Sequence, residues 1–61
     1  MRIPRVRERV RLEGRDQEYL VVWVDLENRV ADLIPAANGG DLEEGVPFHA
    51  IRPVADDIPK G

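Results

Sequence analysis

Side chains that could carry out covalent chemistry are almost absent from this sequence. It contains no Cys, no Ser and no Thr, so the Tyr19 phenol is its only hydroxyl group. Nucleophilic catalysis through a serine, threonine or cysteine is therefore excluded. We expect a protein that is not an enzyme.

Other kinds of site chemistry are equally poorly supplied. His49 is the single histidine, and without a second histidine or a cysteine it lacks the two or three convergent ligands of a transition-metal site. Asp25 and Asp32 could face each other as paired carboxylates, but a chain this short has no enclosed pocket to desolvate them. Gly39-Gly40 lacks the Lys and the Ser or Thr that follow in a phosphate-binding loop. We expect no metal, no cofactor and no small-molecule substrate.

Charge is distributed unevenly along the chain. Residues 1–15 carry six arginines against two glutamates, a net charge of plus four, while residues 16–61 carry three bases against ten acids, a net charge of minus seven. An acidic body does not favour nucleic-acid binding over the whole surface, because phosphate affinity needs clustered positive charge. The basic segment predicts a weak nucleic-acid or ribonucleoprotein contact as an alternative function, through Arg5, Arg7, Arg9, Arg11 and Arg15. The same arginines could instead pair with acids of neighbouring strands or of a second copy of the chain.

Most of the large apolar side chains lie in residues 19–35, which we expect to form a β-hairpin. Two runs rich in Val, Ile, Leu, Trp and Tyr flank a polar link, and such residues favour strands. Asn28 is expected to supply the turn, because asparagine tolerates the left-handed backbone better than most residues.

Two registers of this hairpin are open. A two-residue turn places Val24 opposite Ala31 and Trp23 beside Asp32. A three-residue link over residues 26–28 instead places Trp23 opposite Ala31, and this slip of one residue reverses which face is core. We favour the two-residue turn, because it gathers five apolar residues on one face: Leu20, Val22, Val24, Ala31 and Leu33.

The other face of the hairpin is apolar as well. A domain of this size buries only about 60% of the surface of its unfolded chain, so it has little with which to cover a second face. Exposed apolar patches usually mark association surfaces. The sequence therefore predicts a non-catalytic protein–protein interaction module that binds a partner protein or a second copy of itself. The expected interface comprises Tyr19, Val21, Trp23 and Ile34, together with Phe48.

The remaining segments predict short strands around the hairpin. Residues 4–13 alternate charged and apolar side chains, which indicates a strand with an outer ladder of arginines. Glu8 breaks its apolar face and suggests an edge position or a bulge. After the hairpin we expect a loop over 36–40, one helical turn over 41–45, an edge strand over 46–48, a 3₁₀ turn over 49–51 and a last strand over 52–54.

These elements predict an all-β domain over residues 1–54 and a flexible tail over residues 55–61. Four to five short antiparallel strands with a 3₁₀ turn before the last one are expected to close into a small, partly open barrel. The order of segments 10–14, 21–25, 30–34 and 46–54 resembles the SH3-like barrels of the Tudor type. This resemblance covers residues 5–54.

The Tudor resemblance implies a cage of aromatic rings around a methylated lysine or arginine. The chain offers only Tyr19, Trp23 and Phe48. Tyr19 and Trp23 lie about 13 Å apart on one predicted strand, whereas a bound cation must lie within ~6 Å of each ring. Residues 10–14 before a Val-rich strand are also similar to KOW segments of ribosomal and transcription proteins, but the glycines that usually follow are missing. Core packing or a dry interface is the expected place for the three rings.

The sequence also bears on location. No apolar run approaches the roughly 18 residues of a membrane span, and residues 1–5 lead into charges rather than into the apolar core of a signal peptide. The lack of cysteine excludes a disulfide framework. We expect a cytoplasmic protein with no membrane partner.

Overall fold

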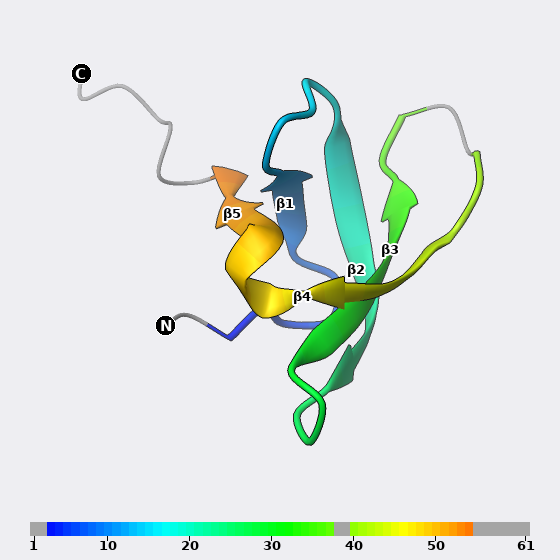
Figure 1. Ribbon diagram of the computed structural model, residues 1–61. Coiled ribbons are helices and arrows are strands. Elements are labelled where there is room, and N and C mark those ends of the chain that lie inside the picture. The colour runs from blue at the N-terminus through cyan, green and yellow to red at the C-terminus, as the bar shows by residue number, and fades with distance from the viewer. Residues whose placement is uncertain (1–2, 38–39, 55–61) are drawn as a thin grey trace.

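The computed structural model describes residues 3–37 and 40–54, which form one open antiparallel sheet (Figure 1). Its five strands are β1 (Arg9–Leu12), β2 (Glu18–Asp25), β3 (Val30–Pro35), β4 (Glu43–Pro47) and β5 (Ile51–Pro53). The 3₁₀ turn η1 (Phe48–Ala50) directly precedes β5. The order across the sheet is β4-β3-β2-β1-β5, so β1 joins the last strand to the central hairpin. The predicted all-β fold with a 3₁₀ turn before the last strand is confirmed.

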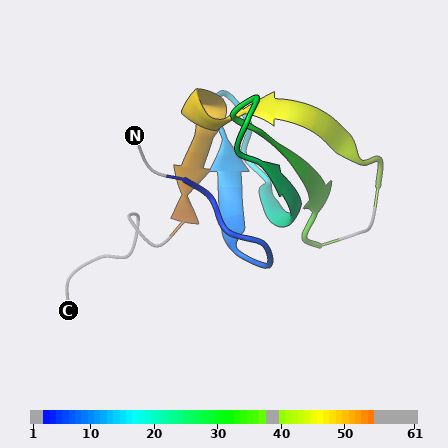
Figure 2. The ribbon, with the colours of Figure 1, turned by 90° about the horizontal axis from the view of Figure 1, so that it is seen from below.

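The core lies on the concave side of this curled sheet, where β4 and η1 cross the face of β2 and β3 (Figures 1 and 2). Alternate residues of β1, β2 and β3 point into it, as the period of a strand requires. One aromatic ring comes from η1 and one isoleucine from β5. The buried apolar residues are Val10, Leu12, Tyr19, Val21, Ala31, Leu33, Phe48 and Ile51.

The β2–β3 hairpin combines the two predicted registers. Near the turn, Val24 pairs with Ala31 and Trp23 with Asp32, as the two-residue turn predicts. The register then shifts by one, so that Val21 rather than Val22 pairs with Leu33. Val22 is therefore the extra residue of a β-bulge, and side chains before and after it alternate in opposite phase. The predicted core set is wrong for Leu20 and Val22, because the bulge places Tyr19 and Val21 inside in their stead.

The hairpin turn is built differently from the prediction. Asn28 does not take the left-handed conformation, which belongs to Arg29 (φ 58°). The Asp25 carboxylate instead organises residues 26–29: its Oδ1 accepts the N–H groups of Glu27 (3.0 Å) and Asn28 (3.1 Å), and its Oδ2 accepts the Asn28 side-chain amide (2.9 Å). These donors stabilise the ionised carboxylate, the Asn28 side chain most, and they lower the pKa of Asp25.

The strand predicted over residues 4–13 is shorter, because residues 5–8 form a turn. The Glu8 N–H donates to the Arg5 carbonyl (3.0 Å), and the Arg5 N–H donates to Glu8 Oε1 (3.0 Å). Arg7 takes a left-handed conformation (φ 77°), and its N–H donates to the Val21 carbonyl (2.7 Å). The regular strand β1 starts only at Arg9, so the continuous arginine ladder is interrupted at the turn.

Residues 41–45 do not form the predicted helical turn, because Glu43 and the residues after it join the edge of β3. Val46 pairs with Ala31 and Glu43 with Leu33, with a register shift between these pairs. Gly45 is left-handed (φ 64°) and lies at the bulge that accompanies this register shift, where its N–H donates to Asp32 Oδ1 (3.0 Å). One isolated helical turn fixes several dihedrals for a single hydrogen bond, whereas the edge of β3 offers a ladder.

The last elements start one residue earlier than predicted, η1 at Phe48 and β5 at Ile51. Phe48 therefore belongs to the 3₁₀ turn rather than to an edge strand, and its N–H donates to the Arg29 carbonyl (3.0 Å). The tail predicted over residues 55–61, and Asn38 and Gly39 of the predicted loop, lie outside the described residues.

The left-handed residue of the hairpin turn gives a stability prediction. The left-handed conformation costs a residue with a Cβ roughly 1–2 kcal/mol, and replacing Arg29 by glycine removes this cost. Part of the gain is offset, because glycine has a greater conformational entropy in the unfolded chain. We expect Arg29→Gly to raise the free energy of urea unfolding by up to about 1 kcal/mol. Glu27→Gly, in the same turn but without a positive φ, should lower it by about 0.5–1 kcal/mol. Equal effects of the two changes would contradict this account of the turn.

The lowered pKa of Asp25 predicts a pH dependence of stability. Because the folded pKa lies below the unfolded value, the stabilising contribution is present above the unfolded pKa and is lost as pH falls through the folded pKa. Asp25→Asn should therefore be less stable than wild type at neutral pH, and the difference should vanish in strong acid. Urea unfolding of both proteins between about pH 7 and pH 2 measures this. A difference that stays constant over that range would refute it.

Candidate interaction surface

Three of the five predicted interface residues lie in the core. Tyr19 and Val21 are fully buried, and Phe48 is only 4% exposed. Ile34 is half-buried, whereas Trp23 is 62% exposed. The prediction that these five residues share one exposed face is wrong, because the bulge at Val22 turns Trp23 outward while Tyr19 and Val21 point inward.

Another set of apolar residues occupies the outer face of β2 and β3. Leu20 pairs directly with Ile34, and both are half-buried on this face. Val22 and Trp23 are exposed beside them, and Val30 follows on β3. The solvent side of an antiparallel sheet usually alternates to polar residues, so this apolar row is unusual. We refer to it as the outer stripe, defined as Leu20, Val22, Trp23, Val30 and Ile34.

Arginines border the outer stripe on the β1 side. Arg9 pairs with Leu20 across the ladder, and its side chain is 66% exposed although it contacts Glu18 (3.3 Å). Arg11 lies 4.0 Å from the same carboxylate. Arg7 is exposed, and its backbone is bonded to Val21. We refer to Arg7, Arg9 and Arg11 as the arginine flank.

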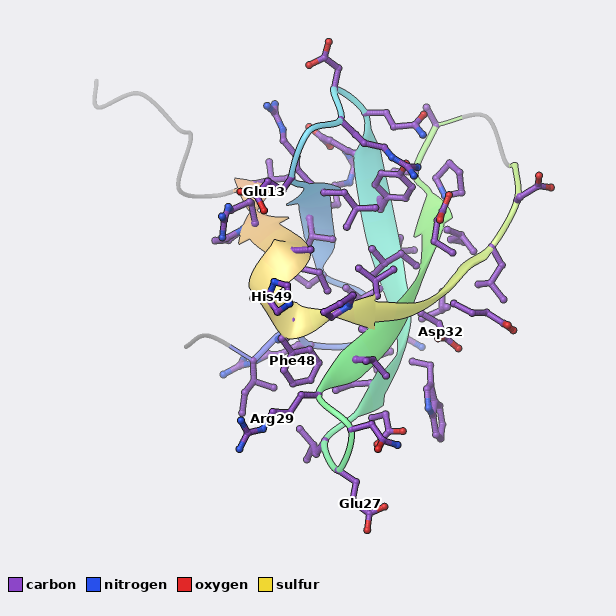
Figure 3. The ribbon with its side chains drawn as sticks, viewed as in Figure 1. Glu13, Glu27, Arg29, Asp32, Phe48 and His49 are labelled. Carbon is purple, nitrogen blue, oxygen red and sulfur yellow. The ribbon has the colours of Figure 1, made fainter. Side chains whose placement is uncertain are left out.

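Acidic side chains lie toward the β4 side of the stripe, and the first of them, Asp32, lies on β3 between the stripe residues Val30 and Ile34. Asp32 is the cross-strand partner of Trp23, and Figure 3 shows it on the other side of β3 from Phe48. Glu44 is exposed on the neighbouring strand β4. The exposed indole of Trp23 therefore lies between a basic and an acidic border.

The five arginines predicted to contact nucleic acid do not all lie together, although Arg7, Arg9 and Arg11 share the arginine flank. Arg5 and Arg7 lie in the N-terminal turn, and Arg9 and Arg11 lie on β1. Arg15 lies in the β1–β2 connection, where its guanidinium donates to the Tyr19 hydroxyl (2.9 Å) and to Glu43 (3.1 Å). The hydrogen bond to Tyr19 raises the pKa of Arg15 most, and the one to Glu43 raises it further. Arg15 thus ties the β1–β2 connection to β4.

The Tyr19 hydroxyl at this end of the core accepts a second hydrogen bond, from the Gln17 side-chain amide (2.7 Å). A buried phenol needs such partners, because an unsatisfied buried hydroxyl is costly. No pattern in the sequence indicates this arrangement, in which Arg15 joins residues on β2 and β4. Its role is structural: it satisfies the one polar atom of a ring that fills the core.

The remaining candidates for chemistry lie apart from one another. Asp25 caps the hairpin turn and Asp32 bonds Gly45, so the two carboxylates do not form the pair considered from sequence. His49 is exposed on η1, and its carbonyl accepts a hydrogen bond from Arg52 (3.3 Å). Among residues 3–37 and 40–54, no three His, Cys, Asp or Glu side chains gather where they could hold a metal ion.

A shallow cleft of about 460 Å³ lies on another part of the surface, near the hairpin turn and η1. It is lined by Ile3, Leu26, Arg29 and Phe48. Sequence reasoning missed it, because its residues come from three separate segments: the N-terminal residues, the hairpin turn and η1.

Comparison with other proteins adds no assignment: no protein-family model, no curated protein and no solved structure matches the chain. In the described part of the chain there is no helix of the length and apolar character needed to cross a membrane.

The contrast between the buried ring of Phe48 and the exposed ring of Trp23 predicts a large loss of stability in one variant and almost none in the other. Phe48→Ala empties part of the core and should lower the free energy of unfolding by about 3–5 kcal/mol. Trp23→Ala removes an exposed ring and should change it by no more than about 0.5 kcal/mol. Urea denaturation followed by circular dichroism measures both variants without relying on tryptophan fluorescence. A Trp23→Ala protein as unstable as Phe48→Ala would place the indole in the core and contradict the outer stripe.

Proposed function

We propose that this chain is a non-catalytic protein–protein interaction module that self-associates through the outer stripe. The observation that carries the proposal is the exposed indole of Trp23 on an apolar sheet face, in a domain whose core is already filled by other residues. Tryptophan is among the residues that most often dominate binding energy at interfaces. Because 62% of Trp23 is exposed, the ring contributes little to the stability of the single chain.

The fold is part of the proposal. The strand order β4-β3-β2-β1-β5 and the 3₁₀ turn before β5 support an SH3-like barrel of the Tudor type. An aromatic cage is not part of it, because Tyr19 and Phe48 are buried and cannot join Trp23 around a cation. The fold therefore supports a binding module without indicating a methylated ligand.

A second copy of the chain is the partner that the charges favour. The arginine flank borders one side of the outer stripe, and Asp32 and Glu44 border the other. A two-fold axis parallel to β2 would pack two stripes face to face and carry the β1 side of one copy over the β3 side of the other. Each arginine flank would then meet an acidic border, which is the self-complementarity of an isologous dimer.

The sheet edges favour packing through faces rather than added strands. β4 contains the left-handed Gly45 and ends at Pro47, and β5 is three residues long and ends at Pro53. Bulges, prolines and short strands are common ways to protect an edge from pairing with another chain. The outer stripe has no such protection.

The nucleic-acid alternative receives less support. Arg9 and Arg11 share Glu18, and Arg15 contacts Glu43, so part of the positive charge is neutralised within the chain. A cytoplasmic location belongs to the main proposal, because the chain has no cysteine that an oxidising compartment would pair.

The proposed dimer predicts that charge changes on its two borders compensate each other. In sedimentation equilibrium, wild type should convert from monomer to dimer between about 1 µM and 1 mM protein. The fluorescence emission of Trp23, the single tryptophan, should shift to shorter wavelength as the indole leaves water. Arg7→Glu and Asp32→Lys should each weaken the dimer about 10-fold or more, and the double variant should regain most of the loss. Trp23→Ala should abolish the dimer.

Two controls keep this test independent of folding. Asp32→Asn retains an oxygen that can accept the Gly45 N–H, so a weaker dimer in this variant reports the charge rather than damage to β4. Arg29→Glu makes the same charge reversal as Arg7→Glu but lies in the hairpin turn beside Phe48, away from the arginine flank, and it should leave the dimer unchanged. A monomer throughout the range, or single variants that the double variant does not rescue, would refute self-association. Salt-sensitive binding of labelled RNA, lost in Arg7→Glu with Arg9→Glu, would favour the alternative.

A further inference from the structure

The cleft beside the hairpin turn has the composition of a binding site for an amphiphile. Its floor is the ring of Phe48, which is almost fully buried, and its apolar walls are Ile3 and Leu26. Both wall residues are well exposed, Leu26 at 63%. Its volume, about 460 Å³, lies within the usual range of small-molecule sites. Apolar side chains that remain exposed around a buried aromatic floor leave a surface that an apolar group could cover.

Among the described residues that line the cleft, Arg29 is the only charged one. Figure 3 shows Arg29 next to Phe48 at the end of β3. Within the described residues its guanidinium makes no ion pair. The cleft therefore combines an apolar wall with a cation that has no carboxylate partner in this part of the chain.

The backbone holds Arg29 in place. Its φ of 58° is a left-handed conformation that is unfavourable for arginine. The Arg29 carbonyl accepts the Phe48 N–H (3.0 Å), which joins the cation-bearing turn to the residue that forms the cleft floor. Strained conformations are retained where the surrounding structure enforces them, and they are enriched at binding sites. The strain and the lining are independent observations that point to the same place.

We propose that this cleft binds a small amphiphile with a carboxylate head and a short, unbranched apolar tail. The planar guanidinium of Arg29 can donate two parallel hydrogen bonds to a carboxylate, and the tail would lie against Ile3, Leu26 and Phe48. An extended peptide is disfavoured, because the hydrogen-bonding edges of β4 and β5 do not line the cleft. The site is distinct from the outer stripe, since the two share no residue.

Octanoate, octan-1-ol and octyltrimethylammonium test the proposal, because they share a tail and differ in head group. Titrated into the folded chain and followed by NMR, octanoate should bind with a dissociation constant of about 0.1–1 mM and shift signals of Leu26, Arg29 and Phe48. The alcohol should bind about 10-fold more weakly, and the cation weaker still. Equal binding of octanoate and the alcohol would overturn the role of the guanidinium.

Matched variants identify the site. Arg29→Asn removes the charge, and asparagine tolerates the left-handed backbone at this position. The variant should bind octanoate about 10-fold more weakly than wild type does, with the affinity that wild type has for the alcohol. Arg29→Lys should keep part of the preference for octanoate. Leu26→Gln, at an exposed position, should weaken the binding of both octanoate and the alcohol without affecting folding. Arg9→Gln and Trp23→Ala, which lie outside the cleft, should bind octanoate like wild type.

Three results would overturn the proposal. Octanoate affinity unchanged in Arg29→Asn would exclude the carboxylate contact. Signals that follow Trp23 rather than Leu26 would move the ligand to the outer stripe. A short peptide with a C-terminal leucine that binds more tightly than octanoate, and depends on Arg29, would replace the amphiphile by the end of a protein chain. Because Trp23→Ala abolishes only the proposed dimer, failure of one proposal can be distinguished from failure of the other.

Discussion

The extra residue at Val22 is the constraint on which the rest of this structure depends. β2 is the longest strand and pairs on both sides, with β1 and with β3, so its side-chain phase decides what each face of the sheet presents. The bulge reverses that phase in mid-strand. Before it, Tyr19 and Val21 point into the core, and after it Val24 packs against the same core while Trp23 points outward. A regular strand would place Trp23 on the same face as Tyr19 and Val21, and would leave no exposed aromatic ring on the outer face.

The connections between strands are held by side chains as much as by backbone. Asp25 organises the β2–β3 turn, Glu8 closes the N-terminal turn, and Asp32 bonds the bulge of β4. Arg15 links the β1–β2 connection to β4 while capping the buried Tyr19 hydroxyl. A chain with no disulfide and few buried residues relies on such local polar contacts to fix its loops. This explains how charged residues contribute to order although they lie at the surface.

The two surfaces of interest follow from the small size of the domain. The core cluster of the described chain holds eight buried hydrophobic residues, and the apolar side chains that find no room there remain at the outer stripe and around the cleft. Their settings differ. The outer stripe is a sheet face between borders of opposite charge, which favours a broad and self-complementary partner. The cleft is concave and carries one cation, which favours a small anionic ligand.

The sequence by itself determined the class of the fold, because β-branched and aromatic runs separated by turn residues can hardly form anything but short strands. It also excluded nucleophilic catalysis by serine, threonine or cysteine, and it predicted the pairing of Val24 with Ala31 next to the turn. It could not determine the core face of β2, since that strand is apolar at both odd and even positions and its pattern therefore favours neither. Only the tertiary structure decided this, through the bulge at Val22, which buries Tyr19 and Val21. The tertiary structure alone also brought Arg15 to Glu43, and Ile3 and Leu26 to Phe48, because contacts between distant segments depend on the path of every turn between them.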